Sequence, residues 1–588
     1  MLTRKSLYLL GIAVLPGLLY AATSARTRPV IAPQIPTADR TGGNRVFLEH
    51  ADILRKAESD SFMVLVNNVV FTKGPMYMRC DSAHYFPDTE SMDAFGNVAM
   101  EQGDTLFVYA DELNYDGATE KAVLYADPGK KVRMINRDVM LETDIFTYDM
   151  AIELGYYDTG GTLTDPQNTL TSLQGEYAPS TKDANFYRGV HLNSRNSSDT
   201  LDIFSDTLLY NTVSKVAELY SPSRVINARG TIYTSNGLYN TETSVAALYD
   251  RSVIHTSGGQ WLTADTIFYT RPGGYAEAFG SLVMTDSVHS ADICGDYGYY
   301  DEAADSSYIT GHAVLREYAR EDTLYLHARH IHTFRRIDSI AVAPDTVAGT
   351  PASVRMDTTH IAIAYPRVRF FRTDLQGVAD SMAFTEADST LRLYFAPVIW
   401  SEDRQITGSE IHLLMGDSTI RRATIPEQAL AVLHIEEDYY NQMSGKEMIA
   451  TFKPDGNLER LNINGSVDLI LYPEESDSTI NKMVQAQSSF LEAHFNGRTT
   501  ERIKTWNDTK GSATPLFLLK RSQMFLPKFL WHEGFRPSSP TDIYTVPQAQ
   551  EDLMRAIGRG TPAEPPARST SVATVPEEDD DDDNIENP

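Results

Sequence analysis

His327, His330 and His332 form the only cluster of histidines in the sequence, and histidine is a common metal ligand. On a β-strand, His330 and His332 would share one face, because strand side chains alternate with period two. Neither a nearby cysteine nor a helical zinc spacing accompanies them. We therefore expect an exposed strand face here, with no metal and no cofactor.

The motifs of common catalytic sites are missing from the sequence. It has no Gly-x-Ser-x-Gly elbow, no His-Glu-x-x-His motif and no glycine-rich phosphate loop. Carboxylate pairs are frequent in a chain this acidic, so they do not indicate glycoside hydrolysis. We expect no catalytic residues and no enzyme. A β-helix polysaccharide-degrading enzyme stays open as an alternative, because such sites need no local signature.

The two cysteines do not form a disulfide framework. Cys80 and Cys294 are separated by seven of the repeats described below. In an extended array their Cα atoms would lie well beyond the ~7 Å that a disulfide tolerates. We predict that both are unpaired, small buried residues.

The composition points to an exported β protein. The net charge of −29 excludes nucleic acid as a partner and disfavours anionic membrane surfaces. Arg4 and Lys5 precede an apolar run from Leu7 to Tyr20, which small residues follow. This pattern predicts a signal peptide at 1–25, and hence an exported protein. A retained anchor is the alternative, although the run is short for a membrane span.

The main signal is an internal repeat with the phrase Asp-x-x-x-Tyr. From Tyr85 to Tyr300 the tyrosines follow one another at steps of 30, 33, 29, 33, 29, 30 and 31 residues. A fixed step near 30 is typical of a stacked architecture. We expect each repeated Asp to hydrogen-bond the backbone beside a turn, and each Tyr to pack with its hydroxyl at the rim.

A second phrase in each repeat contains glycine or asparagine between two strand-like runs. Examples are Phe95-Gly-Asn-Val98, Phe279-Gly-Ser-Leu282 and Ile463-Asn-Gly-Ser-Val467. The runs around these phrases are rich in Tyr, Thr and Val, which favour pleated, half-buried strands. Each repeat is therefore predicted to hold two or more short strands.

Several segments interrupt the periodicity. We expect repeat domains at 46–335 and 361–475, separated by a loop insertion at 336–360. A helix is predicted at 478–496, from its Ser/Thr start and the following Gly497. The apolar stretch 516–535 is expected to close one end of the array, so that 476–536 forms an end segment. Beyond it, 537–588 is predicted to be a disordered acidic tail with one short helix near 549–557.

Together these phrases resemble the OstA-like lipopolysaccharide-transport family, which includes LptA-type periplasmic bridge proteins and the N-terminal domain of LptD. The residues that carry the resemblance are the Gly-Asn-Val phrase, the Ala-Asp-x-x-x-Tyr phrase, and Ser444 to Phe452 followed by Leu461 to Gly465. The resemblance covers roughly Val46 to Tyr472, in a longer version with many repeats.

The resemblance implies an all-β, elongated open β-jellyroll whose groove shields lipid A acyl chains on their way to the outer membrane. It also implies a location in the periplasm, in association with the outer membrane. Contacts with an inner-membrane exporter and an outer-membrane translocon would form through open strand edges. The strand patterns predict groove-lining residues: Phe107, Phe146, Phe204, Phe268 and Leu469. A one-residue slip in register would reverse their faces. The alternative is a structural or adhesive surface β-solenoid without lipid cargo.

Overall fold

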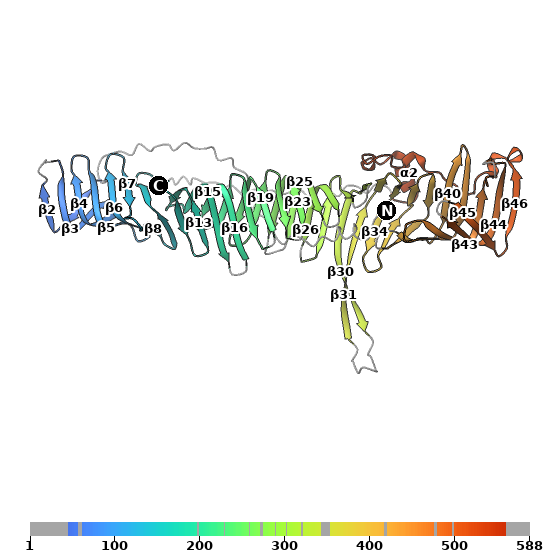
Figure 1. Ribbon diagram of the computed structural model, residues 1–588, viewed down its shortest axis with the longest axis horizontal. Helices are drawn as coiled ribbons and strands as arrows, with labels where there is room; N and C mark the ends of the chain where they lie inside the picture. Colours follow the sequence, from blue (N-terminus) through green and yellow to red (C-terminus); the bar gives the residue numbers. More distant parts are fainter. Residues whose placement is uncertain are drawn as a thin grey trace, which may run out of the picture.

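The computed structural model describes residues 45–559 apart from short gaps at 57–60, 197–198, 229, 258, 271–274, 288–289, 302, 319–321, 343–352, 417–419, 476–478 and 497–498. The signal peptide expected at 1–25 lies outside this range. Within it, 46 strands form one hydrogen-bonded ladder, and neighbouring strands pair antiparallel. The strands follow one another along an elongated array, which confirms the all-β repeat fold (Figure 1).

The ladder is folded into two facing sheets, which we call sheet I and sheet II. Ten long strands run through both sheets: β3 (Met63–Lys73), β4 (Met76–Phe86), β5 (Ser91–Gln102), β6 (Leu106–Asp116), β15 (Asp183–Asn196), β16 (Asp199–Asn211), β25 (Tyr275–Asp286), β26 (Ala291–Asp301), β43 (Leu458–Leu471) and β44 (Lys482–Asn496).

Shorter strands complete each sheet. Those of sheet I are β2 (Ile53–Lys56), β7 (Lys121–Tyr125), β10 (Ile145–Asp149), β11 (Leu154–Tyr157), β14 (Gln174–Ala178), β17 (Val216–Leu219), β20 (Asn236–Asn240), β21 (Ala246–Tyr249), β24 (Thr266–Thr270), β27 (Ser306–Thr310), β30 (His330–Val342), β31 (Ser353–Tyr365), β34 (Ser381–Thr385), β35 (Thr390–Tyr394), β38 (Glu410–Met415), β39 (Ile420–Ile425), β42 (Glu447–Phe452) and β45 (Thr499–Trp506). Those of sheet II are β1 (Phe47–His50), β8 (Val132–Asn136), β9 (Val139–Thr143), β12 (Gly161–Thr164), β13 (Asn168–Ser172), β18 (Ser223–Asn227), β19 (Gly230–Thr234), β22 (Ser252–Thr256), β23 (Gln260–Ala264), β28 (Val314–Glu317), β29 (Leu324–His327), β32 (Val368–Arg372), β33 (Leu375–Ala379), β36 (Val398–Ser401), β37 (Arg404–Thr407), β40 (Ala429–Glu436), β41 (Tyr439–Gly445) and β46 (Lys510–Pro515).

The glycine phrases of the repeat are the bends where a long strand passes from one sheet to the other. In β5, Gly96 and Asn97 have φ of 74° and 44°, and the register with both neighbours shifts there. A Cβ on Gly96 would lie 2.5 Å from Oδ2 of Asp81, the repeated aspartate. Asn97 Nδ2 donates to the same carboxylate at 2.8 Å. The repeated Asp and Gly therefore build the bend, as Gly280 does beside Asp265 and Gly311 beside Asp296.

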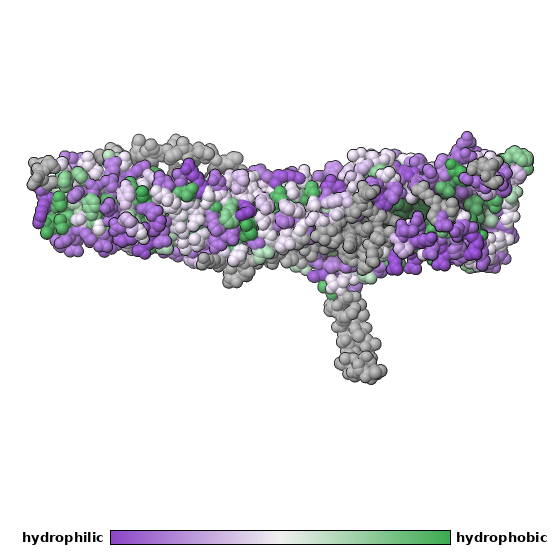
Figure 2. Space-filling view, in the orientation of Figure 1, coloured by the Kyte–Doolittle hydropathy of each residue, from purple (hydrophilic) through white to green (hydrophobic). Residues whose placement is uncertain are grey.

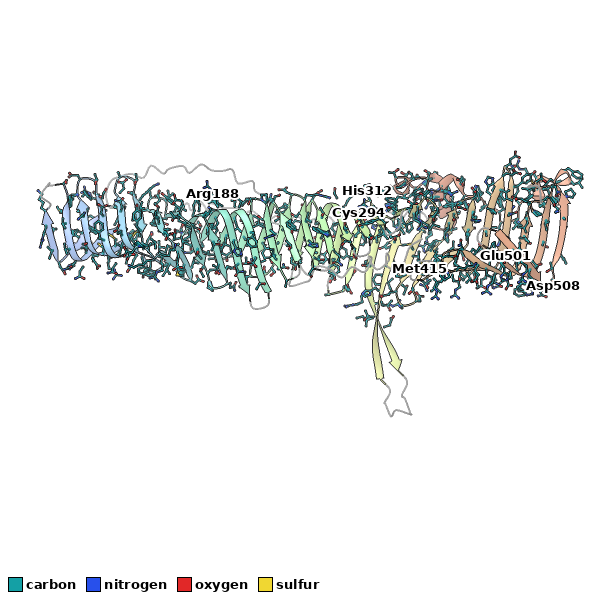
Figure 3. All side chains as sticks on the ribbon, in the orientation of Figure 1. Arg188, Cys294, His312, Met415, Glu501 and Asp508 are labelled. Atoms are coloured by element: carbon teal, nitrogen blue, oxygen red, sulfur yellow. The ribbon has the colours of Figure 1, made fainter. Side chains whose placement is uncertain are left out.

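In the middle of the array the bends lie along one long edge. Figure 3 labels Arg188 and His312, two further bend residues with positive φ, on that edge. The hairpin turns of both sheets lie along the opposite edge, which we call the mouth. The projecting part of the β30–β31 hairpin extends beyond the array on the mouth side (Figure 1).

A single apolar core fills the space between the sheets. Its buried residues run from Val46 to Ala493 without a break into separate clusters. The face shown in Figure 2 is mostly polar, with hydrophobic residues in scattered groups. No helix in the described part of the chain is long and apolar enough to span a bilayer.

Two secondary-structure predictions were wrong. The segment 478–496 is strand β44 rather than a helix, because the open edge of β43 pairs with it and Leu491 and Ala493 face the core with period two. The insertion 336–360 is largely the hairpin β30–β31, since its prolines fall between the strands, at 343–352, outside the described residues.

The segment 516–559 does not close an end of the array, contrary to expectation. It runs back along the outer face of sheet II as 3-10 turns η3 (Leu516–Leu518), η4 (Arg521–Gln523), η5 (Glu533–Phe535) and η6 (Asp542–Tyr544) and helix α2 (Gln548–Ala556) (Figure 1). We call it the strap. The first part of the predicted disordered tail, 537–559, is thus ordered, and its predicted short helix is α2. Residues 560–588 lie outside the described chain.

Buried amides on sheet II hold the strap by its backbone. Gln442 donates from Nε2 to Met524 O at 2.8 Å and accepts from Leu526 N, also at 2.8 Å. The completely buried side-chain amide of Gln442 thus bonds one carbonyl and one N–H of the strap, as the backbone of a neighbouring β-strand would. Gln405 does the same with Leu530 O and His532 N, both at 2.7 Å.

We predict that Gln442→Leu loosens the strap without disturbing the two sheets. The change leaves one backbone carbonyl and one amide of the strap buried without partners, at about 1–3 kcal/mol each. Limited proteolysis should cut 516–535 faster in this variant. Gln487→Leu is the control, because Gln487 hydrogen-bonds Asp468 at an exposed position. Equal cleavage of both variants would contradict the assigned role of Gln442.

Candidate functional site

The interior between the two sheets is the candidate site. Side chains along each strand alternate between the inner and the outer face of a sheet, and only those on the inner face reach the site. In β10, for example, Phe146 and Tyr148 point inward and are each 1% exposed. Residues on the facing strands of sheet II, such as Leu141 and Leu163, are equally buried. The interior is therefore a tightly packed apolar layer.

The structure places two of the five predicted groove residues inside and three outside. Phe146 and Leu469 belong to the core. Phe107, Phe204 and Phe268 lie on outer faces, so their predicted orientation was wrong. In each case the adjacent aliphatic residue points inward instead, and Ile203 and Ile267 are fully buried.

The outward phenylalanines pack with neighbours on the sheet surface. Phe204 is 36% exposed, stacks on His191 with ring centroids 4.4 Å apart, and lies under the Arg224 guanidinium. Phe268 contacts the ring of Phe279 edge-on. Cross-strand aromatic pairs of this kind stabilise a sheet face without contributing to its core.

The repeated tyrosines are the inward residues nearest the mouth. Tyr115, Tyr148 and Tyr210 are almost completely buried. Their hydroxyls cross from sheet I to polar groups on sheet II. Tyr115 OH accepts from Lys73 Nζ at 2.5 Å, and Tyr148 OH donates to Gln102 Oε1 at 2.9 Å. The tyrosines thus hold the two sheets together at the mouth.

A second side chain accompanies each tyrosine, five residues further along. Glu120, Glu153, Lys182 and Lys215 all have positive φ, which turns the hairpin of sheet I. Each reaches a polar residue of sheet II that precedes it in the chain by 46 to 51 residues. Sequence reasoning missed these residues, although the constant offset from the repeated tyrosine was visible in the sequence.

These contacts form a regular series of rungs along the mouth, which we call the polar seam. Its contacts are Arg45–Glu90 at 2.9 Å, Lys73–Glu120 at 3.3 Å, Gln102–Glu153 at 3.0 Å, Asn136–Lys182 at 3.1 Å and Asp165–Lys215 at 2.8 Å. Neighbouring rungs from Tyr115 onward are two strands apart, or roughly 10 Å.

The rung at Asp165 is the most deeply buried. The carboxylate is fully shielded from solvent and accepts from Lys215 Nζ and, at 2.6 Å, from Tyr210 OH. Burial pushes the pKa of Asp165 up, but the bonds from Lys215, Tyr210 and the backbone amides of Gln167 and Asn168 outweigh it, so the pKa lies below its usual value. Asp165 is therefore a charged clamp across the mouth.

The N-terminal end of the interior is lined by flexible side chains. A cavity of about 30 Å³ lies there, bordered by the thioethers of Met76, Met78, Met92, Met100 and Met150. Methionine adapts to irregular apolar ligands because its side chain is unbranched and polarizable.

Two of the three histidines, His330 and His332, lie on the outer face of sheet I. His330 Nδ1 is 2.6 Å from Tyr308 OH, and His332 Nε2 is 2.9 Å from Ser306 Oγ. Burial lowers the pKa of both imidazoles. Among the described residues, no three His, Cys, Asp or Glu side chains are grouped to hold a metal.

The two cysteines are free thiols, as predicted. Cys80 is buried, and burial raises its pKa to about 12. Cys294 is only partly buried, which differs from the expectation, and burial raises its pKa as well.

We predict that Lys215→Met weakens the seam locally by about 3 kcal/mol, because the buried Asp165 carboxylate loses its cation. Hydrogen exchange of amides 163–170 and 208–217 should rise. The double variant Lys215→Gln/Asp165→Asn should recover most of the protection, since it keeps a hydrogen bond and removes both charges. If these amides exchange as fast in the double variant as in Lys215→Met, the interpretation of Asp165 as a charged clamp is wrong.

The same clamp predicts a pH dependence. The pKa of Asp165 is lower in the folded protein than its usual 3.8, so the stabilisation is complete above about pH 4 and is lost as the pH falls through the folded pKa. Exchange at this rung, corrected for intrinsic rates, should therefore increase at acid pH in the wild type. In Asp165→Asn this increase should disappear.

Comparison with known proteins supports the resemblance. The family model described as "OstA-like protein" matches residues 43–202. No curated protein matches the sequence. A crystal structure of LptH, the LptA homologous periplasmic component of the lipopolysaccharide transport device of Pseudomonas aeruginosa, is similar at 14% identity; the match covers 24% of this chain and 79% of that one. The TM-score of this match is 0.13. The family match spans the N-terminal rungs of the polar seam, so this part of the chain, residues 43–202, is OstA-like.

Proposed function

We propose that this chain is a lipopolysaccharide-binding scaffold of the periplasm that shields lipid A acyl chains during transport to the outer membrane. The observation that carries the proposal is the single apolar interior, continuous from Val46 to Ala493 between two sheets. Burial of an alkyl chain there is favourable by about 0.8 kcal/mol per CH₂. The OstA-like match at 43–202 supports the same role.

In this scheme the protein binds and does not catalyse. Binding requires the sheets to separate at the mouth, because interior residues such as Leu163 and Leu170 are fully buried in this structure. The acyl chains then replace contacts that the side chains of the two sheets make with each other. Energy and direction come from other components.

The partners we propose are the inner-membrane exporter and the outer-membrane translocon of lipopolysaccharide transport. The end strands β2 and β46 are almost entirely exposed. Among the described strands, β2 pairs with β3 and β46 pairs with β44, so that the other edge of each strand faces outward. Such an edge can accept a further strand from a partner, which would extend both sheets.

A second candidate function is a structural surface solenoid without lipid cargo. The packed interior and the hydrogen-bonded mouth favour it, since a solenoid needs no space for a ligand. The two functions make opposite predictions about contact between lipid and the inward residues.

We predict that a photoreactive amino acid at Phe146 or Leu469 cross-links to lipopolysaccharide in cells. The outward positions Phe107, Phe204 and Phe268 are the controls and should give no adduct. Proteins are compared after purification, and adducts are detected with antibody against lipopolysaccharide. If the protein is folded and neither inward position gives an adduct, the result would favour the structural solenoid without lipid cargo.

A further inference from the structure

Three lysines of the polar seam are withdrawn from water at the boundary of the apolar interior. The side chains of Lys73 and Lys215 are only 10% and 13% exposed, and Lys182 is half-buried. Burial and the nearby Arg137 lower the pKa of Lys182. In a chain with 51 basic and 80 acidic residues, cations at this boundary are a distinctive feature.

Closing the mouth does not require these charges. The rung between Lys73 and Lys182 uses neutral Gln102, which bonds both Tyr148 OH and Glu153. Shielded ion pairs are in general no more stabilising than well-packed neutral groups, because desolvation offsets the attraction. The lysines therefore call for an explanation other than stability.

Their position matches that of a lipid headgroup. Alkyl chains in the interior would leave the headgroup at the mouth, where the lysine ammonium groups lie. We propose that Lys73, Lys182 and Lys215 are ligands for the phosphate groups of a lipid whose chains occupy the interior. This inference rests on the proposed function.

In the structure, acidic or amide side chains take the place of the phosphate. Glu120 lies 3.3 Å from Lys73, Asp165 lies 2.8 Å from Lys215, and Asn136 lies 3.1 Å from Lys182. When the sheets separate, the shielded Asp165 gains access to water, which the partly exposed Glu120 already has. Phosphate oxygens then replace both carboxylates as acceptors. Charge-assisted bonds then hold a lipid that the net charge of −29 would otherwise repel.

The test compares binding of lipid A and of enzymatically dephosphorylated lipid A to the full-length protein. The wild type should bind the phosphorylated form at least about tenfold more tightly, a difference of 1.4 kcal/mol. Lys73→Gln/Glu120→Gln and Lys215→Gln/Asp165→Asn should each reduce this preference about threefold or more. Both double variants keep hydrogen-bonding side chains of nearly the same size and leave no single buried charge.

The matched control is Lys130→Gln/Asp111→Asn. This ion pair, at 2.6 Å, lies at the bends rather than at the mouth, and its loss should not alter the preference. Equal binding of both lipids by the wild type, or an unchanged preference in the seam variants, would overturn this inference alone. If the seam variants lose affinity for both lipids equally, the lysines have a structural role only, and this result would also overturn the inference. Failure of the wild type to bind either lipid would overturn the proposed function itself.

Discussion

The bend in each long strand is the constraint on which the rest of the structure depends. A strand whose side chains alternate with period two can serve two facing sheets only if it turns sharply between them. In β5, β25 and β43 that turn uses two successive residues with positive φ, the first of which is glycine. Because the register shifts at the turn, the inward side chains on both sides of it face the same interior.

The bends also explain why polar groups collect at the opposite edge. With one edge fixed by the backbone, the two sheets can move apart only at the mouth, where hairpin turns leave polar side chains close together. The hydrogen bonds of the seam are each worth about 1 kcal/mol net. That is comparable to the burial of one or two CH₂ groups. An alkyl chain that replaces several rungs can therefore compensate for their loss, provided that the interior side chains stay in contact with it.

The sequence predicted the architecture because the repeated residues are those that the backbone requires. Asp81 and Gly96 meet at a bend, and Tyr115 and Tyr148 recur because one position per repeat faces the mouth. The faces of individual strands were harder to predict. Phe204 and Ile203 are both suitable for a core, and only the register with β15 and β18 decides between them. Likewise, the apolar residues of β44 are compatible with a helix when the sequence is considered alone. Pairing with the edge of β43 makes this segment a strand. The strap was missed because its partners, Gln405 and Gln442, look like ordinary surface residues in the sequence.

The strap divides the array into parts with different resistance to opening. In the C-terminal part, sheet II is buried on both faces: Trp400 is covered by Phe535, and Arg369 donates to Phe535 O at 3.0 Å and Gln550 Oε1 at 2.6 Å. Sheet II strands of the N-terminal part, such as β12 and β13, have one buried and one partly exposed face. The strap therefore adds a second packed layer to sheet II in the C-terminal part, and this layer resists bending of the sheet. Sheet II should be easier to deform where the strap is absent, and there the family match and the lysine-bearing rungs are found.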